Sequence, residues 1–358
     1  MRPFLRACLL FGAGFAACLL GCELLLRGMP VDEPIAFAPA GRPTLLVPNA
    51  PHTDYQYSAR WFMLNAQAGR TNNYGQVEGA DFQRDSQPLI VVGDSYVESL
   101  MNPEPVRLQS RLAEDYRVPV YGLGVSGLSA SDYVVMARQA RAEFKPRAAV
   151  FAIIDGDFVE SLQLQPRRYR LRLEEGVEHL DYTPLSPSPV MQRLRASPLG
   201  KLALLDYLQY NLAFTPTQAL PQLRKAAPHA RQPDPAAPMA VVDWFLEELP
   251  KALELPPACI SLAVDADRYA IYDPKLASPP KDAPEVRRHL IEAARARGFN
   301  VVDLEPVFRT GYARDGLKFD HWPLDRHWNA LGHRTVAQAI EKSWAASGAA
   351  SACELKGG

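Results

Sequence analysis

Short apolar runs alternate with helix-like segments along most of this sequence, and this alternation constrains the fold more than any other feature. The runs lack the polar alternation of strands with one solvated face, so they are typical of strands buried on both faces. They cover residues 89–92, 118–121, 148–154, 260–264 and 300–304. Strands separated by helices pair in parallel through crossover connections. We therefore predict an α/β fold, a three-layer sandwich with a parallel sheet covered by helices.

One central region interrupts the alternation. Residues 162–257 are rich in Arg and Pro, and Pro disfavours regular structure because it fixes φ and lacks a backbone donor. We predict a single domain at 59–346 that carries an insertion at about 162–257 and is followed by a tail at 347–358. The chain length of 358 residues fits one α/β domain with insertions.

An apolar segment precedes the domain. Residues 4–26 contain only two charged side chains, Arg6 and Glu23, and about 20 apolar residues are enough for a helix to cross the hydrocarbon core. Arg2 and Arg6 lie on one side and acidic residues on the other, which places the N-terminus in the cytoplasm. We predict a single-pass transmembrane anchor at 1–28, a Pro-rich linker at 29–58, and a domain on the periplasmic or outer side of the inner membrane.

Two other interpretations of this segment stay open: a cleaved signal peptide, and a lipoprotein signal that ends at Cys22 in Leu-Leu-Gly-Cys. The apolar run continues past Cys22 without a small-x-small cleavage site, which favours the anchor. All three interpretations export the domain. An oxidising compartment allows its two cysteines, Cys259 and Cys353, to form a disulfide, although Cys259 suits a buried apolar position equally well.

Charge and motif content exclude several classes of partner. The 39 Lys and Arg residues against 40 Asp and Glu residues give no excess positive charge for nucleic acid. The basic run at 167–172 suits an anionic lipid or polysaccharide, or one solvated face of a strand. The sequence contains no phosphate loop, zinc motif or dinucleotide fingerprint. We therefore expect no nucleic acid, no metal and no cofactor.

A Gly-Asp-Ser triplet at 93–95 directly follows the first apolar run. Active groups of open α/β sheets gather at the carboxyl ends of the strands, and the small Gly93 permits a tight turn that exposes the hydroxyl of Ser95. A serine attacks carbonyl carbon only when a base removes its proton and a third group orients that base. The triplet alone is also compatible with an ordinary turn.

Three histidines follow the last predicted strand. Residues two apart in an extended loop point the same way, so Asp325 and His327 can project together. His333 falls within the next predicted helix and His321 precedes a turn with proline, which indicates structural roles for both. His327 is therefore the candidate base, and Asp325 the candidate orienting carboxylate.

Several blocks together resemble the SGNH, or GDSL-type, hydrolase superfamily. They are Gly-Asp-Ser at 93–95, Gly-Val-Ser-Gly at 124–127 and Asp-Arg-His-Trp-Asn at 325–329. The similarity covers about 60–160 and 258–345 and is greatest to a membrane-anchored bacterial branch, which the upstream Asn-Tyr-Gly at 73–75 also resembles. The resemblance implies an SGNH-hydrolase-like fold in which Ser95 is the nucleophile, His327 the base and Asp325 its orienting partner, with motif support from Asp94 and Asn329.

The resemblance also implies an oxyanion hole formed by the backbone N–H groups of Ser95 and Gly127. The family's third donor, an Asn, is replaced here by Gly156 within Asp-Gly-Asp. Losing one oxyanion donor typically costs about 10² to 10³ in rate, which leaves catalysis feasible. Asp155 or Asp157 would bind a hydroxyl-rich acceptor or lie in solvent as strand-end carboxylates.

The function that this resemblance implies is a membrane-anchored extracytoplasmic serine esterase or O-acyltransferase. Its substrates would be short acyl esters, acetyl above all, of an envelope carbohydrate, and the reaction would pass through an acyl-enzyme on Ser95. The alternative is a non-catalytic module of the same fold that binds an envelope glycan or a partner protein. The absent Asn favours the module, whereas the presence of all three triad positions in order favours the enzyme.

Overall fold

The chain forms two compact units in the computed structural model, and each is described by itself. One unit comprises Met1–Ala36, Asp54–Gly69 and Ser186–Pro228, and the other, called the sheet unit here, comprises Phe37–Thr53, Arg70–Leu185 and His229–Gly358. The residues that the structure describes are 2–33, 35, 49–116, 118–174, 177–184, 193, 197–214 and 236–355.

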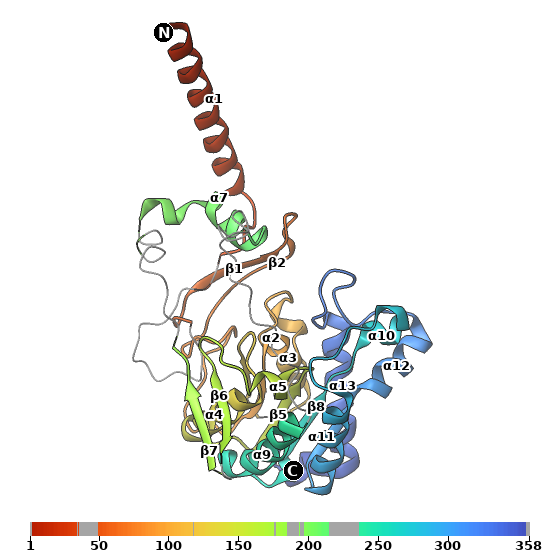
Figure 1. Ribbon diagram of the computed structural model, residues 1–358. Helices are drawn as coiled ribbons and strands as arrows, with labels where there is room; N and C mark the ends of the chain where they lie inside the picture. Colours follow the sequence, from red (N-terminus) through yellow and green to blue (C-terminus); the bar gives the residue numbers. More distant parts are fainter. Residues whose placement is uncertain are drawn as a thin grey trace. The chain divides into compact units, whose positions relative to one another are not determined.

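A parallel five-stranded sheet forms the centre of the sheet unit (Figure 1). Its strands stand in the order β4-β3-β5-β8-β9, which is 2-1-3-4-5 in chain order, and all neighbours pair in parallel. The order reverses at β3, so the carboxyl ends of β3 and β5 flank the place where such sheets bind ligands. The strands are β3 (Leu89–Gly93), β4 (Val120–Gly124), β5 (Ala148–Ile153), β8 (Ile260–Val264) and β9 (Asn300–Asp303).

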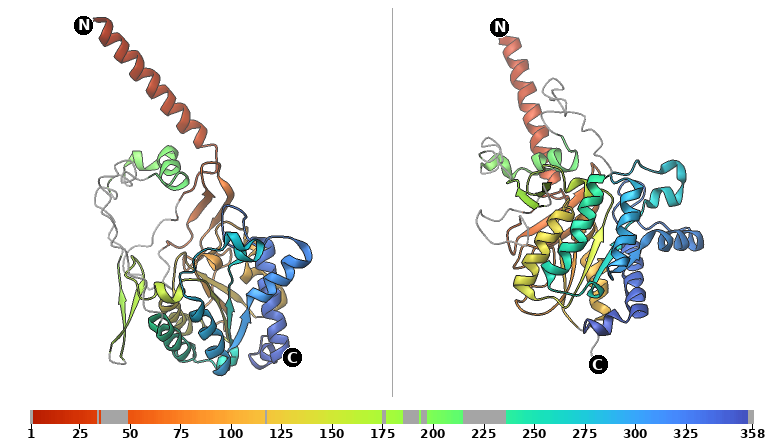
Figure 2. Two further views of the ribbon diagram at one scale, coloured as in Figure 1. Left: turned by 45° about the vertical axis from the view of Figure 1, so that its right-hand side comes forward. Right: turned by 60° about the horizontal axis from the view of Figure 1, so that its bottom comes forward.

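Helices cover both faces of this sheet (Figure 2). Along β3, Ile90 and Val92 join one buried cluster while Leu89 and Val91 join the other, because successive side chains of a strand point to opposite faces. The first cluster is covered by α4 (Ala130–Phe144), α9 (Ala236–Leu253) and α11 (Pro284–Ala296), and the second by α3 (Leu108–Asp115), α12 (Leu304–Asp315) and α13 (Ala330–Ser347). The predicted α/β fold with a helix-covered parallel sheet is confirmed.

Helix α9 lies within the region 162–257 that the sequence marked as an insertion, yet it packs between α4 and α11. Its side chains Val242, Phe245 and Leu249 are fully buried in the main core. The same region contains an antiparallel hairpin of β6 (Tyr169–Glu174) and β7 (Val177–Tyr182). Part of this region therefore supplies the core of the sheet unit.

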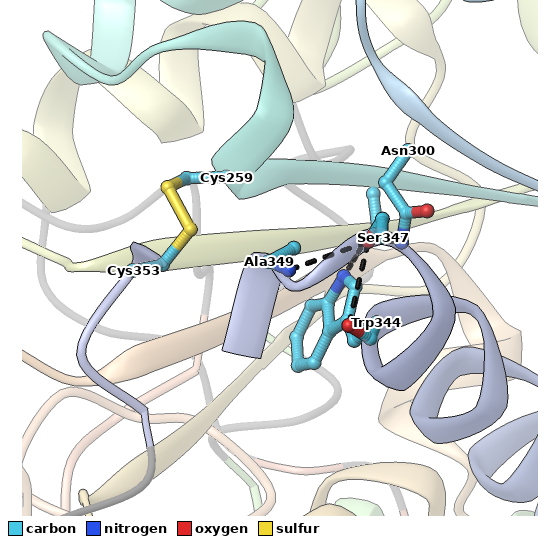
Figure 3. The surroundings of a disulfide bond; sticks show 7 residues. Cys259, Asn300, Trp344, Ser347, Ala349 and Cys353 are labelled. Atoms are coloured by element: carbon cyan, nitrogen blue, oxygen red, sulfur yellow. Dashed lines mark hydrogen bonds between the residues drawn. A yellow bond between two sulfur atoms is a disulfide. The ribbon is translucent and has the colours of Figure 1, made fainter. Parts of the chain in front are cut away.

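A disulfide joins Cys259 to Cys353 (Figure 3). Cys259 ends the short 3-10 helix η5 (Pro257–Cys259) that leads into β8, and Cys353 follows α14 (Ala349–Ala352). The two residues are 94 positions apart in the sequence, and closing a loop of that length stabilises a fold by roughly 4 to 5 kcal/mol in the chain-entropy treatment. The bond fastens the C-terminal end of the described chain to the start of β8.

The other unit begins with helix α1 (Arg2–Leu26), the long apolar helix that the sequence predicted. An 18-residue window within its stretch Pro3–Leu26 has a mean hydropathy of 2.1. The stretch is long and apolar enough to cross a membrane, a property shared by anchors and signal sequences. The unit also contains β1 (Asp54–Ala59), β2 (Leu64–Arg70), α7 (Ala203–Asp206) and the π-helical turn η3 (Tyr207–Asn211). Of the predicted linker 29–58, residue 34 and residues 36–48 lie outside the described residues.

Candidate functional site

Ser95 stands at the carboxyl end of β3, where helix α2 (Ser95–Glu98) begins. Asp94 caps this helix, because its Oδ1 accepts a hydrogen bond from the backbone N–H of Tyr96 at 2.9 Å. The helix approaches β4 so closely that a Cβ on Gly124 would lie 2.1 Å from a backbone nitrogen of α2. The missing side chain of Gly124 thus permits the strand–turn–helix that presents the Ser95 hydroxyl.

His327 and Asp325 reach Ser95 from the loop before α13. His327 Nε2 lies 2.7 Å from Ser95 Oγ, and His327 Nδ1 lies 2.5 Å from Asp325 Oδ1. An ionised carboxylate only accepts, so Nδ1 carries the ring proton and Nε2 is left to accept the Ser95 proton. The structure therefore brings Ser95, His327 and Asp325 together in one hydrogen-bonded chain.

The carboxyl group of Asp325 is held in its charged form. Burial raises its pKa, but hydrogen bonds from the His327 ring and backbone N–H, together with the electrostatic interaction with His327, outweigh that effect and leave the pKa below its usual range. The carboxyl group of Asp94 differs, since burial raises its pKa above the usual range. Asp325 is therefore the anion that stands behind the imidazole at neutral pH.

A buried arginine holds the backbone that presents His327. Arg268 is 4% exposed, pairs with the Asp265 carboxylate and donates to the carbonyl oxygen of Arg326, the residue before His327. The Tyr96 hydroxyl donates to the same oxygen at 3.0 Å, and its ring centroid lies 4.8 Å from that of the imidazole. We did not predict this network from the sequence, although the place of Asp265 and Arg268 just after β8 was a usable signal.

Asn329 fixes the start of α13. Its Oδ1 accepts hydrogen bonds from the backbone N–H groups of Leu331 and Gly332 at 2.9 and 3.0 Å. Its Nδ2 donates to the carbonyl oxygens of Lys318 and Asp320. The side chain is thus a helix cap that also closes the loop carrying His327.

The turn at Ser126 and Gly127 is tied to α2 and to an arginine. Glu98 Oε2 accepts from the backbone N–H of Ser126 at 2.9 Å and from its hydroxyl. Gly127 has φ 76, and a Cβ there would lie 2.0 Å from Arg168 Nη2, which donates to Ser126 O at 3.3 Å. Arg168 Nη1 is buried and has no hydrogen-bond partner among the described residues. This member of the basic run 167–172 thus lies against the expected oxyanion turn.

Lys281 covers Gly156, the position where the resemblance places an Asn. Gly156 has φ 104, and a Cβ there would lie 2.6 Å from Lys281 Cδ. The Lys281 ammonium pairs with Glu160 at 2.6 Å. The aliphatic part of Lys281 therefore fills the space that a side chain at position 156 would need.

The two carboxylates beside Gly156 have backbone partners. Asp155 accepts from the N–H groups of Lys281 and Asp282, both at 3.0 Å. Asp157 is 3% exposed and accepts from the N–H of Ile154 at 2.8 Å, and burial raises its pKa well above the usual range. Both side chains thus order the loops after β5.

Ser95 and His327 line a cavity of about 670 Å³. Most of the other lining residues follow β5 and β8, lie in α10 (Arg268–Tyr272) and the segment after it, or belong to α11. The lining mixes apolar side chains with charged ones, among them Ile153, Val264, Tyr269, Lys281, Arg287 and Arg326. A cavity of this volume at strand carboxyl ends is typical of sites for small molecules or for one end of a longer ligand.

A second serine–histidine pair lies close by in the sequence. Ser99 Oγ is 2.9 Å from His333 Nε2. His333 Nδ1 accepts the backbone N–H of Leu108 at 3.1 Å, so the proton of the neutral ring is on Nε2 and is donated to Ser99. Burial lowers the pKa of His333 to about 3, and both residues are 1% exposed. His333 is therefore unable to take a proton from Ser99.

Comparison with solved structures finds several chains with limited likeness to this one, among them LAE5 and TesA. LAE5, an alpha/beta hydrolase enzyme from the metagenome of Lake Arreo in Spain, shares 15% identity at a TM-score of 0.39 over 75% of this chain and 97% of its own. TesA shares 13% identity at a TM-score of 0.38 over 73% of this chain and 99% of its own. No family model matches the sequence, and no curated protein matches it.

Proposed function

We propose that this chain is a membrane-anchored, extracytoplasmic serine esterase or O-acyltransferase of SGNH type. The observation that carries the proposal is the chain Asp325–His327–Ser95, which ends on a serine that lines a cavity. The motif resemblance supports short acyl esters, acetyl above all, of an envelope carbohydrate as substrates. Helix α1, with arginines at its start, supports attachment to the inner membrane with the sheet unit outside the cytoplasm.

Acylation begins at Ser95. Its Oγ attacks the carbonyl carbon of the ester while the hydroxyl proton moves to His327 Nε2. The charge on Asp325 stabilises the imidazolium that forms, and the carbonyl oxygen becomes an oxyanion. The bond to the leaving oxygen then breaks, and the proton on Nε2 passes to the alcohol that departs, which leaves the acyl group on Ser95.

Deacylation repeats these steps with a new nucleophile. Water or a sugar hydroxyl gives its proton to His327 Nε2 and attacks the acyl carbon. The bond to Ser95 Oγ breaks, and Oγ recovers the proton. Water makes the reaction a hydrolysis, and a sugar hydroxyl makes it a transfer, so access to the cavity decides between an esterase and an O-acyltransferase.

The oxyanion needs hydrogen-bond donors, and we propose three groups for this role. The N–H of Ser95 opens helix α2 and has no partner within that helix. Gly127 N–H lies on the turn that Glu98 tethers. Arg168 brings a buried N–H without a partner among the described residues to the same turn. We assign Arg168 as the candidate substitute for the Asn that position 156 lacks.

An acyl-transfer assay tests the proposal on the full chain in detergent micelles. We expect release of phenol from an aryl acetate and a transient acetyl group on Ser95, located by peptide mass spectrometry. Adding an oligosaccharide acceptor separates transfer to sugar from hydrolysis. If the wild-type protein binds the glycan but shows neither turnover nor an acetylated Ser95, the non-catalytic module is favoured. The absence of an Asn at Gly156, where Lys281 fills the space, is the observation that supports that alternative.

A further inference from the structure

The C-terminal end of α1 belongs to the small core of its unit. Leu26, Val31 and Met63 are 7%, 8% and 7% exposed and form one apolar cluster. Side chains of α7 and η3 pack against this cluster, and α7 lies beside the end of α1 in Figure 1. The last turn of the apolar helix is thus a packed part of the folded protein.

Glu23 ties this end of α1 to α7. Its carboxylate accepts the backbone N–H groups of Ala203 and Leu204 at 3.2 and 3.0 Å, at the N-terminus of α7, and it also accepts from Arg27 Nε at 2.7 Å. Its side chain is 9% exposed. Removal of α1 as a cleaved signal peptide would leave the two N–H groups without this partner and remove Leu26 from the core, so the contacts favour a helix that is retained.

Glu23 also limits the part of α1 that a membrane would cover if α1 spans it. The stretch from Pro3 to Cys22 supplies the roughly 20 residues that a helix needs to cross the hydrocarbon core. Because Glu23 is enclosed by protein groups, the outer boundary of the core falls at Cys22 or Glu23. Leu26 then lies only about 5 Å beyond it, at a rise of about 1.5 Å per residue, within the interfacial layer of the bilayer.

Two exposed aromatic side chains stand at this level. Trp61 and Phe62 are 67% and 42% exposed, in the turn that connects β1 to β2, directly before Met63 of the cluster. Their ring centroids are 5.3 Å apart, and Trp61 O accepts a hydrogen bond from the Tyr207 hydroxyl at 2.7 Å. The unit exposes further large apolar side chains near the same elements, namely Met29, Leu212 and Phe214.

We propose that this group of elements forms a collar that rests on the outer surface of the bilayer, with Trp61 and Phe62 inserted in the lipid interface. The collar is defined by residues 26–31, 60–63 and 203–214. Trp and Tyr favour the headgroup level because one end of the ring system is apolar and the other is polar. A lipid surface is the partner that fits, since the collar continues directly from a helix apolar enough to cross the membrane.

The proposal rests on the anchoring part of the proposed function and not on its chemistry. The collar needs α1, or at least its residues from Cys22 onward, to remain attached. Processing as a lipoprotein before Cys22 would leave Glu23 and Leu26 in place, and the collar would meet the membrane at the same level. Cleavage after Leu26 would remove the proposed contact.

Quenching of tryptophan fluorescence by lipids tests the insertion. The full chain is reconstituted in vesicles of phosphatidylcholine and phosphatidylglycerol with and without a lipid brominated near the headgroup end of its acyl chain. We expect bromolipid quenching in the wild type that Trp61→Phe largely removes. The matched control is Trp322→Phe, because the other four of the five tryptophans lie in the sheet unit, and we expect it to leave the quenching unchanged.

Two results would overturn the proposal. One is equal bromolipid quenching in the wild type and in Trp61→Phe. The other is Trp61 fluorescence that aqueous iodide quenches as strongly in vesicles as in the chain unfolded by denaturant without detergent. Intact-mass measurement of the vesicle-bound chain is a separate check: a chain that retains Glu23 supports the collar, and one that begins after Leu26 contradicts it. Aryl acetate turnover measured on the same vesicles separates failure of the collar from failure of the proposed enzyme activity.

Discussion

The two serine–histidine pairs differ in the group that is hydrogen-bonded to Nδ1 of the imidazole. The Oγ–Nε2 distances are alike, 2.7 Å for Ser95 and His327 and 2.9 Å for Ser99 and His333. Behind His327 a carboxylate accepts the Nδ1 proton, whereas behind His333 a backbone N–H donates to Nδ1. The first ring can therefore accept a proton from its serine, and the second donates one. A short Ser–His distance alone identifies neither a base nor a nucleophile.

The buried pair has a structural use. Ser99 ends α2, and His333 lies in α13 and accepts the first N–H of α3 through its contact with Leu108. The Ser99 hydroxyl is placed to donate to Met101 Sδ. This pair thus joins three helices behind the candidate site, and its loss should affect stability before it affects chemistry.

The largest expected difference in turnover is between the variants that remove the hydroxyls of Ser95 and Ser99. Ser95→Ala should lower aryl acetate turnover by roughly 10⁴ to 10⁶, because the nucleophile is lost. Ser99→Ala should keep most of the turnover and lower the free energy of unfolding by about 1 to 3 kcal/mol, since buried polar groups lose a partner. Turnover and urea unfolding of both variants give the comparison, and similar losses of turnover in the two would contradict it.

Asp325→Asn should give the His327 ring the proton arrangement of His333, with the proton on Nε2. An amide that donates to Nδ1 moves the ring proton to Nε2, which then cannot take the Ser95 proton. Turnover should fall by about 10⁴ while the structure is retained. A kcat that falls less than tenfold, in a variant whose unfolding curve matches that of the wild type, would contradict this role of Asp325.

Arg168→Gln should have a smaller effect that resides in kcat. If Arg168 is a donor to the oxyanion, its loss should lower kcat by about 10² to 10³ with little change in KM, and Arg168→Lys should restore part of the rate. Arg172→Gln is the matched control, because Arg172 belongs to the same basic run, lies in β6 and pairs with Asp181 at the surface. Equal kinetics of the two Gln variants would remove Arg168 from the site.

The last prediction concerns the pH dependence of stability and leaves turnover aside. His333 has a pKa of about 3 in the folded state and an ordinary value of 6.5 when unfolded. Between these values only the unfolded chain takes up this proton, so stability falls as pH decreases from 6.5 toward 3, by about 1.4 kcal/mol per pH unit.

His333→Gln removes this titration. We expect its free energy of unfolding, measured in urea between pH 4 and 6, to fall less steeply with decreasing pH than that of the wild type. Equal slopes of unfolding free energy against pH for the two proteins would mean that His333 is not held neutral in the folded state. The proposed difference between His333 and His327 would then be weakened.

The sequence predicted the strands because each is buried on both faces and therefore apolar throughout. The second strand is displaced, from the predicted 118–121 to Val120–Gly124, because Gly122 and Gly124 weaken the apolar pattern. Those glycines are needed for close packing, since a Cβ at either would overlap neighbouring groups. Helix α9 escaped assignment to the core because its Pro-rich surroundings dominate the local composition.

The site was predictable where its residues are local in sequence. Ser95 follows a strand directly, and Asp325 and His327 are two apart in one loop, so pattern, spacing and the motif resemblance select them as candidates. Arg268 and Arg168 contact the site through tertiary packing with segments far away in the chain. The places of Arg268 after β8 and of Arg168 in the basic run 167–172 are visible in the sequence, but only the folded chain shows which groups these arginines contact.

Labelling with a fluorophosphonate probe tests the central claim most directly, because the probe reacts with an activated serine without needing the natural substrate. We predict one adduct on the folded full chain, located on Ser95 by peptide mass spectrometry, lost in His327→Ala and retained in His333→Gln. An adduct on Ser99, or no adduct on folded wild-type protein under conditions that label a control serine esterase, would contradict the account.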